Sequence, residues 1–156
     1  MPQQVPSFDG LLPASATASS AKRRNRSKNT HPEVLLRKSL WALGYRFRLH
    51  SKNVRGRPDI LFRPERIALF CDGDFWHGRH WKSRRAKLAR GHNASYWIAK
   101  IEANMRRDLR NRRALRHQGW TVIRFWEGQI NADPWKTALK VAGVVNEVRR
   151  QSRADR

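Results

Sequence analysis

Three strand-like segments in a row, followed by one long helical segment and a fourth strand, restrict the possible folds of this chain most. The segments with alternating or continuous apolar residues are 45–49, 59–62, 67–71 and 120–126. Between the last two of them, from about 93 to 118, apolar residues recur at helical spacing. A helix that crosses between two strands of one sheet favours a mixed sheet covered by helices.

Further helices are expected on both sides of these strands. Thr30 and Glu33 have the spacing of a capping box at the start of a helix, and Gly44 ends that helix. Asp133, followed by a proline, starts a last helix. The stretch 72–92 is expected to be irregular. The predicted order is α-β-β-β-α-β-α, an α/β fold with a mixed four-stranded sheet flanked by helices.

The charge of the chain points to a polyanionic partner. There are 34 Lys and Arg against 12 Asp and Glu, which leaves a formal net charge of +22. A hydrophobic content of 39% is still enough to build a core, unlike that of a disordered polycation. No apolar run approaches the ~20 residues that a membrane-spanning helix needs. A folded domain that binds DNA or RNA is therefore expected.

The basic residues are distributed unevenly along the chain. Residues 1–21 contain neither Lys nor Arg and are predicted to be a disordered tail. They lack the basic start and apolar stretch of a secretory signal, so we expect a cytoplasmic protein. Residues 22–29 form a basic arm, either a solvated leader or a segment that wraps a phosphate backbone. A single domain is expected over 30–150.

Two aspartates stand at strand ends that a hairpin would bring together. Asp59 opens the second strand and Asp72 follows the third, so both are expected at one edge of the sheet. Together they suit Mg²⁺, which prefers oxygen ligands, and Cys71 beside them is a third candidate ligand. A metal next to a phosphodiester can generate hydroxide and stabilise the leaving oxygen. The alternative is that both aspartates only form turns.

The segment after the third strand combines a histidine with two aromatic residues. His77 titrates near neutral pH and could transfer a proton at a phosphate. Phe75 and Trp76 could stack on bases or wedge between them, or they could belong to the core. A zinc site made of Cys71, His77 and His80 is a weaker alternative, because no fourth ligand stands at a standard spacing.

Two further acidic residues have plain structural explanations. Asp108 lies among arginines on the long helix, four residues after Asn104, and fits a surface ion pair. Glu33 fits the reciprocal capping partner of Thr30. On the residues alone, neither is marked as part of a site.

Several motifs, in order, resemble the very short patch repair endonucleases. The segments that carry the resemblance are 26–33, 56–59 (Gly-Arg-Pro-Asp), 72–78, which contains Phe-Trp-His-Gly, 96–108 and 119–127. The resemblance implies a restriction-endonuclease-like fold, with 30–150 as one endonuclease domain. It also implies an enzyme that uses Mg²⁺ to nick DNA 5′ of the thymine in a T·G mismatch.

The resemblance assigns roles to residues of this chain. It places the metal-binding aspartate at Asp59, the general base at His77, and two further catalytic acids at Glu33 and Asp108, to which Asp72 adds an extra carboxylate. The residues expected to bind DNA are Phe75, Trp76, Trp97, Lys28, Asn29, Arg57 and Asn104. The expected partner is double-stranded DNA, mismatched or fully paired, bound by a monomer in the bacterial cytoplasm at the nucleoid.

The chain departs from the family pattern at two places. It has Cys71-Asp72-Gly73-Asp74 where mismatch-nicking members carry Thr-His-Gly-Cys. The family's zinc ligands are replaced by Asp74, Arg79, Trp81 and Gly128, so no structural zinc is expected. These departures leave open a restriction-like nuclease of another specificity, or a DNA-binding protein without catalysis.

Overall fold

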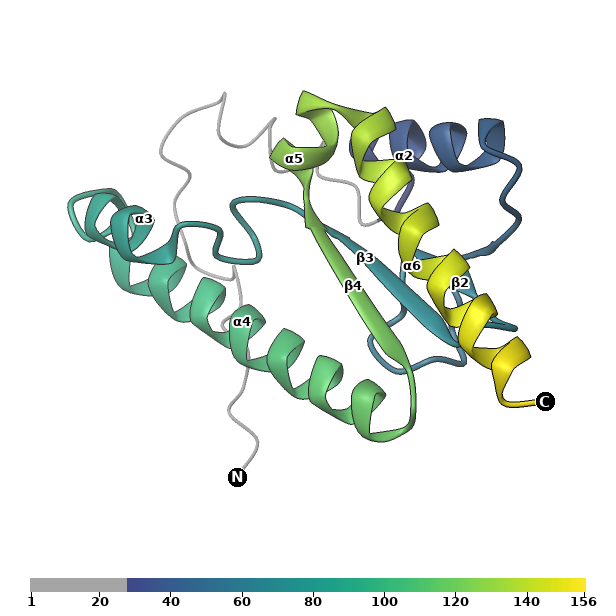
Figure 1. Ribbon diagram of the computed structural model, residues 1–156. Helices are drawn as coiled ribbons and strands as arrows, with labels where there is room; N and C mark the ends of the chain where they lie inside the picture. The colour runs from purple at the N-terminus through teal and green to yellow at the C-terminus, as the bar shows by residue number, and fades with distance from the viewer. Residues whose placement is uncertain (1–27) are drawn as a thin grey trace.

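A four-stranded mixed sheet lies between two groups of helices (Figure 1). The structure is a computed structural model and describes residues 28–156. The predicted tail 1–21, and all of the predicted arm except Lys28 and Asn29, lie outside the described residues. In chain order the elements are α2 (His31–Ala42), β1 (Arg48–Leu49), β2 (Ile60–Phe62), β3 (Ile67–Asp72), α3 (Trp81–Leu88), α4 (Ala94–His117), β4 (Thr121–Trp126), α5 (Glu127–Ala132) and α6 (Pro134–Ala154).

The strands follow one another across the sheet in the order β1-β2-β3-β4. β2 runs antiparallel to both β1 and β3, and β4 runs parallel to β3 after the crossover through α3 and α4. This confirms the mixed sheet predicted from the three consecutive strands and the crossing helix. Ile60 at the start of β2 pairs with Leu69 in the middle of β3, so Asp59, just before β2, lies beside the second half of β3.

The two faces of the sheet are covered by different helices, as Figure 1 shows with α4 on one side and α6 on the other. Ile60 and Leu69 point towards α2, α5 and α6, where they join the larger hydrophobic core. Their strand neighbours Leu61 and Ala68 point to the opposite face, where they pack with Leu115 of α4. The alternation of buried side chains along β2 and β3 thus produces an α/β/α arrangement.

Two short helices were missed by the prediction from sequence. The stretch 72–92, expected to be irregular, contains α3, which has no buried residue and therefore no apolar pattern to reveal it. After β4 the chain forms α5, although it contains Gly128. The side chain of Gln129 accepts a hydrogen bond from the backbone N–H of Trp126 (2.9 Å) at the start of this helix, and Ile130 is buried.

None of the helices within residues 28–156 could cross a membrane, because each is too short or too polar.

Candidate active site

A cavity of about 930 Å³ opens where the end of β3, the loop before β2 and α4 meet. It is lined by residues from six separate segments of the chain, from the start of α2 to the start of α5. Most of the side chains that the sequence marked as candidates contribute to its wall. Those of them that line the cavity are Lys28, Glu33, Arg57, Asp59, Cys71, Asp72, Phe75, Trp76, His77, Asn104 and Asp108.

Asp59 lies at the edge of the sheet where the prediction placed it. The backbone N–H of Cys71 donates a hydrogen bond to Asp59 Oδ2 (2.7 Å), which ties the start of β2 to the end of β3. Burial raises the pKa of Asp59 to about 7, and the nearby carboxylates of Glu33 and Asp72 push it in the same direction. No cationic side chain contacts this carboxylate in the described part of the chain. Its charge is therefore available for a cation.

Glu33 belongs to the same part of the cavity, and its predicted capping role is wrong in detail. The side chain of Thr30 caps no backbone N–H of α2. Instead, Glu33 Oε1 accepts from the hydroxyl of Thr30 (3.1 Å) and Oε2 accepts from the backbone N–H of Asn29 (3.0 Å). The carboxylate is only 3% exposed, and one of its oxygens lies within 4.8 Å of a carboxylate oxygen of Asp59.

His50 is a residue of this site that the sequence did not reveal. Its Nε2 lies 2.9 Å from Glu33 Oε2, and its backbone N–H donates to the carbonyl oxygen of Asp59 (3.2 Å). The ligand atoms of Glu33, His50 and Asp59 all lie within 4.8 Å of one another. The only signal in the sequence was a histidine directly after a strand that pairs with the strand of Asp59.

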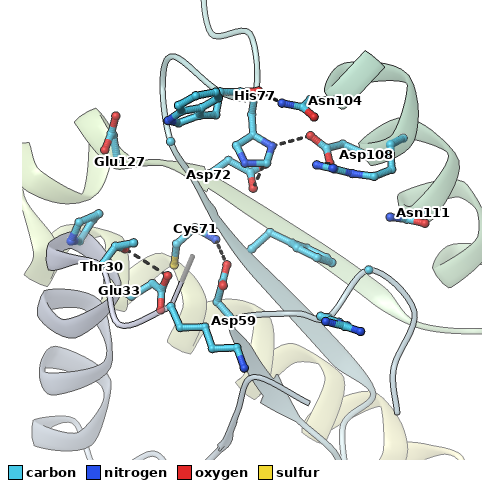
Figure 2. Close-up of a pocket in the computed structure, with 18 of the residues that line it drawn as sticks. Thr30, Glu33, Asp59, Cys71, Asp72, His77, Asn104, Asp108, Asn111 and Glu127 are labelled. Carbon is cyan, nitrogen blue, oxygen red and sulfur yellow. Dashed lines mark hydrogen bonds and ion pairs between the residues drawn. The ribbon is translucent and has the colours of Figure 1, made fainter. Parts of the chain in front are cut away.

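A second group of acids and a histidine stands beside the first. Figure 2 shows His77 turned towards Asp108 on α4, with Asp72 below it. His77 Nδ1 lies 2.5 Å from Asp108 Oδ2 and 3.8 Å from Asp72 Oδ1. Because an ionised carboxylate only accepts hydrogen bonds, Nδ1 carries the proton and Nε2 is left for another partner.

The electrostatics of this group favour a positive charge on the histidine. Burial alone would lower the pKa of His77, but the hydrogen bond to Asp108 and the charges of Asp72 and Asp108 outweigh it and raise the pKa above 6.5. Burial likewise opposes ionisation of Asp108, yet its bonds to His77 and Arg107 lower its pKa. Asp108 thus does more than form the surface ion pair expected from its position among arginines.

Arg124 is the second residue that sequence reasoning missed. Its Nε forms an ion pair with Asp72 Oδ2 at 2.5 Å, and its Nη2 donates to the carbonyl oxygen of His77 (3.4 Å). The guanidinium also lies 3.8 Å from the ring centroid of Trp126. The charge of Asp72 is therefore already compensated, in contrast to that of Asp59.

Cys71 is tied to this site by the hydrogen bond from its backbone N–H to Asp59. Burial, followed by the negative charges of Asp59 and Glu33, raises the pKa of the Cys71 thiol well above its ordinary value. A protonated thiol is a poor ligand for a hard cation. Within residues 28–156, the groups of three or more potential ligands close enough for one metal ion contain neither Cys71 nor His80. The alternative zinc site of Cys71, His77 and His80 is therefore not formed.

The aromatic residues marked by the sequence gather at the cavity. The ring centroids of Phe75, Trp76 and Trp97 lie 5.3–5.7 Å from one another. All three are partly exposed, and none belongs to the two hydrophobic clusters of the core. Asn104 holds the loop by donating from Nδ2 to the carbonyl oxygen of Trp76 (3.0 Å).

The remaining DNA-binding candidates are divided between the cavity and its surroundings. Lys28 and Arg57 line the cavity with their charges, and both are exposed. Asn29 lies beside it, where its side-chain oxygen accepts a hydrogen bond from Arg37 (2.8 Å).

Comparisons with known proteins find similar DNA endonucleases. A family model described as DNA mismatch endonuclease Vsr matches residues 13–83. Among similar proteins, the type II nicking enzyme V.NmeDIP of Neisseria meningitidis serogroup C is 43% identical over 123 residues, which are 79% of this chain and 82% of that protein. The type II nicking enzyme V.HpaIIP of Haemophilus parainfluenzae is 40% identical over 126 residues, covering 81% and 88%.

A mismatch endonuclease is also similar to this chain. DNA mismatch endonuclease Vsr of Escherichia coli (strain K12) is 32% identical over 112 residues, 72% of this chain and 70% of that protein. These relatives are matched over most of their length, and the sheet and its acid–histidine cavity agree with the motifs that carry the resemblance. The chain therefore belongs to the Vsr family of DNA endonucleases, and its mixed sheet is the restriction-endonuclease-like core of that family.

Proposed function

We propose that this chain is a Mg²⁺-dependent DNA endonuclease that nicks one strand of double-stranded DNA beside a T·G mismatch. The observation that carries the proposal is the pairing of two features in one cavity. Asp59 is a buried carboxylate without a compensating cation, and His77 beside it is held by Asp108 with Nε2 left for another partner. The relatives described as nicking enzymes and as a mismatch endonuclease support the same activity.

The donor atoms around Asp59 fit a divalent cation. Glu33 and Asp59 offer carboxylate oxygens, which Mg²⁺ prefers, and His50 lies within the same 4.8 Å. Both carboxylates are largely buried, and their mutual repulsion would be relieved by a cation. We assign these residues to hold the ion, and Asp72 to orient His77, because Arg124 already compensates its charge. When bound, Mg²⁺ would neutralise charge that develops on the phosphodiester oxygens.

His77 is proposed as the general base. Because its Nδ1–H donates a hydrogen bond to Asp108, Nε2 can accept a proton from the water that attacks phosphorus. The bond from phosphorus to the leaving sugar oxygen breaks in the same step, and that oxygen takes a proton from solvent. The carboxylates of Asp108 and Asp72 then stabilise the imidazolium that forms. Asp108 also selects the tautomer that makes this transfer feasible, so it acts as a positioning residue.

DNA binding is proposed to divide between dispersed cations and the aromatic cluster of Phe75, Trp76 and Trp97. The cations, including Lys28 and Arg57 at the cavity, would contact phosphates and set the register of the duplex. The aromatic cluster would enter the base step next to the mismatch, where unstacking is least unfavourable. We propose that one copy of the 30–150 domain binds each site, at the nucleoid of a bacterial cell.

A second candidate is a nuclease of the same fold with another DNA specificity. Asp72 and Asp74 replace residues that the mismatch-nicking members carry, and the structure holds both in ion pairs at the edge of the cavity, with Arg124 and Arg79. The chemistry around Asp59 and His77 would be the same in either case, and only the selection of the substrate would differ.

Two duplexes that differ in one base pair separate these candidates. We would incubate the protein with a T·G duplex and a fully paired T·A duplex, each labelled on both strands, in Mg²⁺ and in chelator. A Mg²⁺-dependent cut in only the thymine strand of the T·G duplex is expected. Cleavage of both duplexes at equal rates would favour the second candidate. No cleavage of either would leave a DNA-binding protein without catalysis.

A further inference from the structure

The loop 73–80, between β3 and α3, carries the proposed base and two of the three rings of the aromatic cluster. It contains neither helix nor strand, and backbone hydrogen bonds such as that from the N–H of Arg79 to the carbonyl oxygen of Asp74 (3.0 Å) hold its turns. Its attachment to the neighbouring elements depends on contacts that involve side chains. On one side it is attached to α4. Asn104 donates to the carbonyl oxygen of Trp76 (3.0 Å), and Asp108 holds His77.

Another attachment of this loop leads to the junction of β4 and α5. Arg79 Nη1 lies 3.3 Å from both carboxylate oxygens of Asp74. The Asp74 carboxylate also accepts from the backbone N–H of Gly128 (3.3 Å), and the backbone N–H of Asp74 donates to Glu127 Oε1 (2.9 Å). These contacts join both ends of the loop to each other and to α5.

Gly128 has no side chain where this ion pair needs the space. A Cβ atom there would overlap the guanidinium of Arg79 and come within 2.8 Å of Asp74 Oδ2. Its φ is not in the left-handed region, so the backbone itself does not require glycine. A glycine inside a helix destabilises it by roughly 0.5–1 kcal/mol relative to alanine. The space occupied by the ion pair is the structural reason for glycine at this position.

The donor chemistry at this point does not fit a zinc ion. Among the four positions where the resemblance to the family placed zinc ligands, Asp74 is the one that offers a ligand atom of the usual kinds. The guanidinium of Arg79 has only N–H donors and no acceptor, and neither the indole of Trp81 nor Gly128 can coordinate a metal. Yet Asp74, Arg79 and Gly128 meet in space, as ligands of one ion would.

We propose that the Asp74–Arg79 ion pair, seated against Gly128, takes the place of a metal tether and positions the loop 73–80. The two residues are positioning residues, because they contact the loop and α5 and not the proposed reacting atoms. That they affect the rate of nicking rests on the proposed function, whereas that they hold the loop 73–80 in place does not.

Hydrogen exchange tests the tether without any substrate. We would measure amide exchange of peptides that cover 73–80 in the full chain, in Arg79→Met and in Gly128→Ala. Both variants are expected to exchange at least tenfold faster in this loop. Gly128→Ala keeps every charge and improves helix propensity, so it remains informative if Arg79→Met fails to fold. Asp74→Asn/Arg79→Met should exchange no faster than Arg79→Met alone, because the two residues act as a pair.

Matched controls separate the tether from general effects. Gly143 lies on the exposed face of α6, where a Cβ atom would meet no other atom, so Gly143→Ala is the control for Gly128→Ala. Arg149→Met removes a distant ion pair with Glu65 (2.7 Å) and is the control for Arg79→Met. Both should leave exchange of the loop unchanged, and chelator should leave it unchanged in the wild-type protein. Unchanged exchange in Gly128→Ala, or one bound zinc per chain with faster exchange in chelator, would overturn the proposal.

Nicking kinetics supply a second readout. Arg79→Met should lower kcat at least tenfold and leave KM within threefold, because His77 loses its position while dispersed cations still bind the duplex. A rise in KM alone would mean that Arg79 only contacts DNA and would overturn its positioning role. If the wild-type protein does not nick DNA at all, the proposed function fails while hydrogen exchange still decides the tether.

Discussion

Asp59→Asn should make the metal-free protein more stable, although Asp59 is the proposed metal ligand. The amide is nearly the same size as the carboxyl group, and its oxygen can still accept the hydrogen bond from the backbone N–H of Cys71. What the substitution removes is a buried negative charge close to Glu33 and Asp72. A group that is kept for binding a cation is expected to destabilise the fold when the cation is absent.

The pKa of Asp59 gives the size and sign of this effect. Folding raises it from 3.8 to about 7, a rise of about three pH units, and each unit corresponds to about 1.36 kcal/mol. Between these two values the folded state binds more protons than the unfolded state, so stability falls as the pH rises. The loss is complete above pH 7 and amounts to about 4 kcal/mol. For a domain of this size, that is roughly 10 °C in Tm.

Urea unfolding in chelator at pH 4 and pH 8 measures this difference. The free energy of unfolding of Asp59→Asn should match that of the wild type at pH 4 and exceed it by about 4 kcal/mol at pH 8. Asp155→Asn, at the exposed end of α6, is the control and should change stability by less than about 0.5 kcal/mol. Equal or lower stability of Asp59→Asn at pH 8 would refute the view that this carboxylate is buried without compensation.

Three further predictions concern the base, the aromatic residues and the charge. In saturating Mg²⁺ the single-turnover rate should rise with pH through a midpoint above 6.5. Asp108→Asn should lower that midpoint, because the negative charge of Asp108 that raises the pKa of His77 is lost; an unchanged midpoint would argue against His77 as the base. In competition binding, Phe75→Ala/Trp76→Ala should lose the preference for mismatched over paired duplex, and a retained preference would return both rings to a packing role. Fluorescence anisotropy should show that the affinity for DNA falls ~10³–10⁵-fold between about 50 and 200 mM salt, as expected for roughly 6–10 phosphate contacts. A loss of less than about tenfold would contradict binding through dispersed cations.

The sheet and the position of Asp59 could be predicted from the sequence because they depend on local patterns. Short apolar segments and the crossing helix predicted the mixed sheet, and the antiparallel pairing of β2 with β3 places Asp59 beside Cys71. The start of α2 was also predictable, since Pro32 follows Thr30 closely. Each of these features is encoded within a few residues.

The side-chain partners at the site could not be predicted in the same way. His50 contacts Glu33 across 17 positions, and Arg124 contacts Asp72 across 52, so these pairs exist only once the tertiary structure has formed. A polar residue on a strand also has the same appearance in the sequence whether it faces solvent or a cavity. For the same reason, α3 was missed, because a helix without a buried face has no hydrophobic period.

The single-turnover nicking rate of Asp59→Asn on a prebound T·G duplex in Mg²⁺ tests the central claim most directly. The claim is that this cavity hydrolyses DNA with a cation held at Asp59. The rate should fall by roughly 10³-fold, as expected when several kcal/mol of transition-state stabilisation is lost. The Kd for the duplex should stay within threefold, since binding rests on dispersed cations. A rate within tenfold of the wild type would contradict the assignment of the metal site to Asp59.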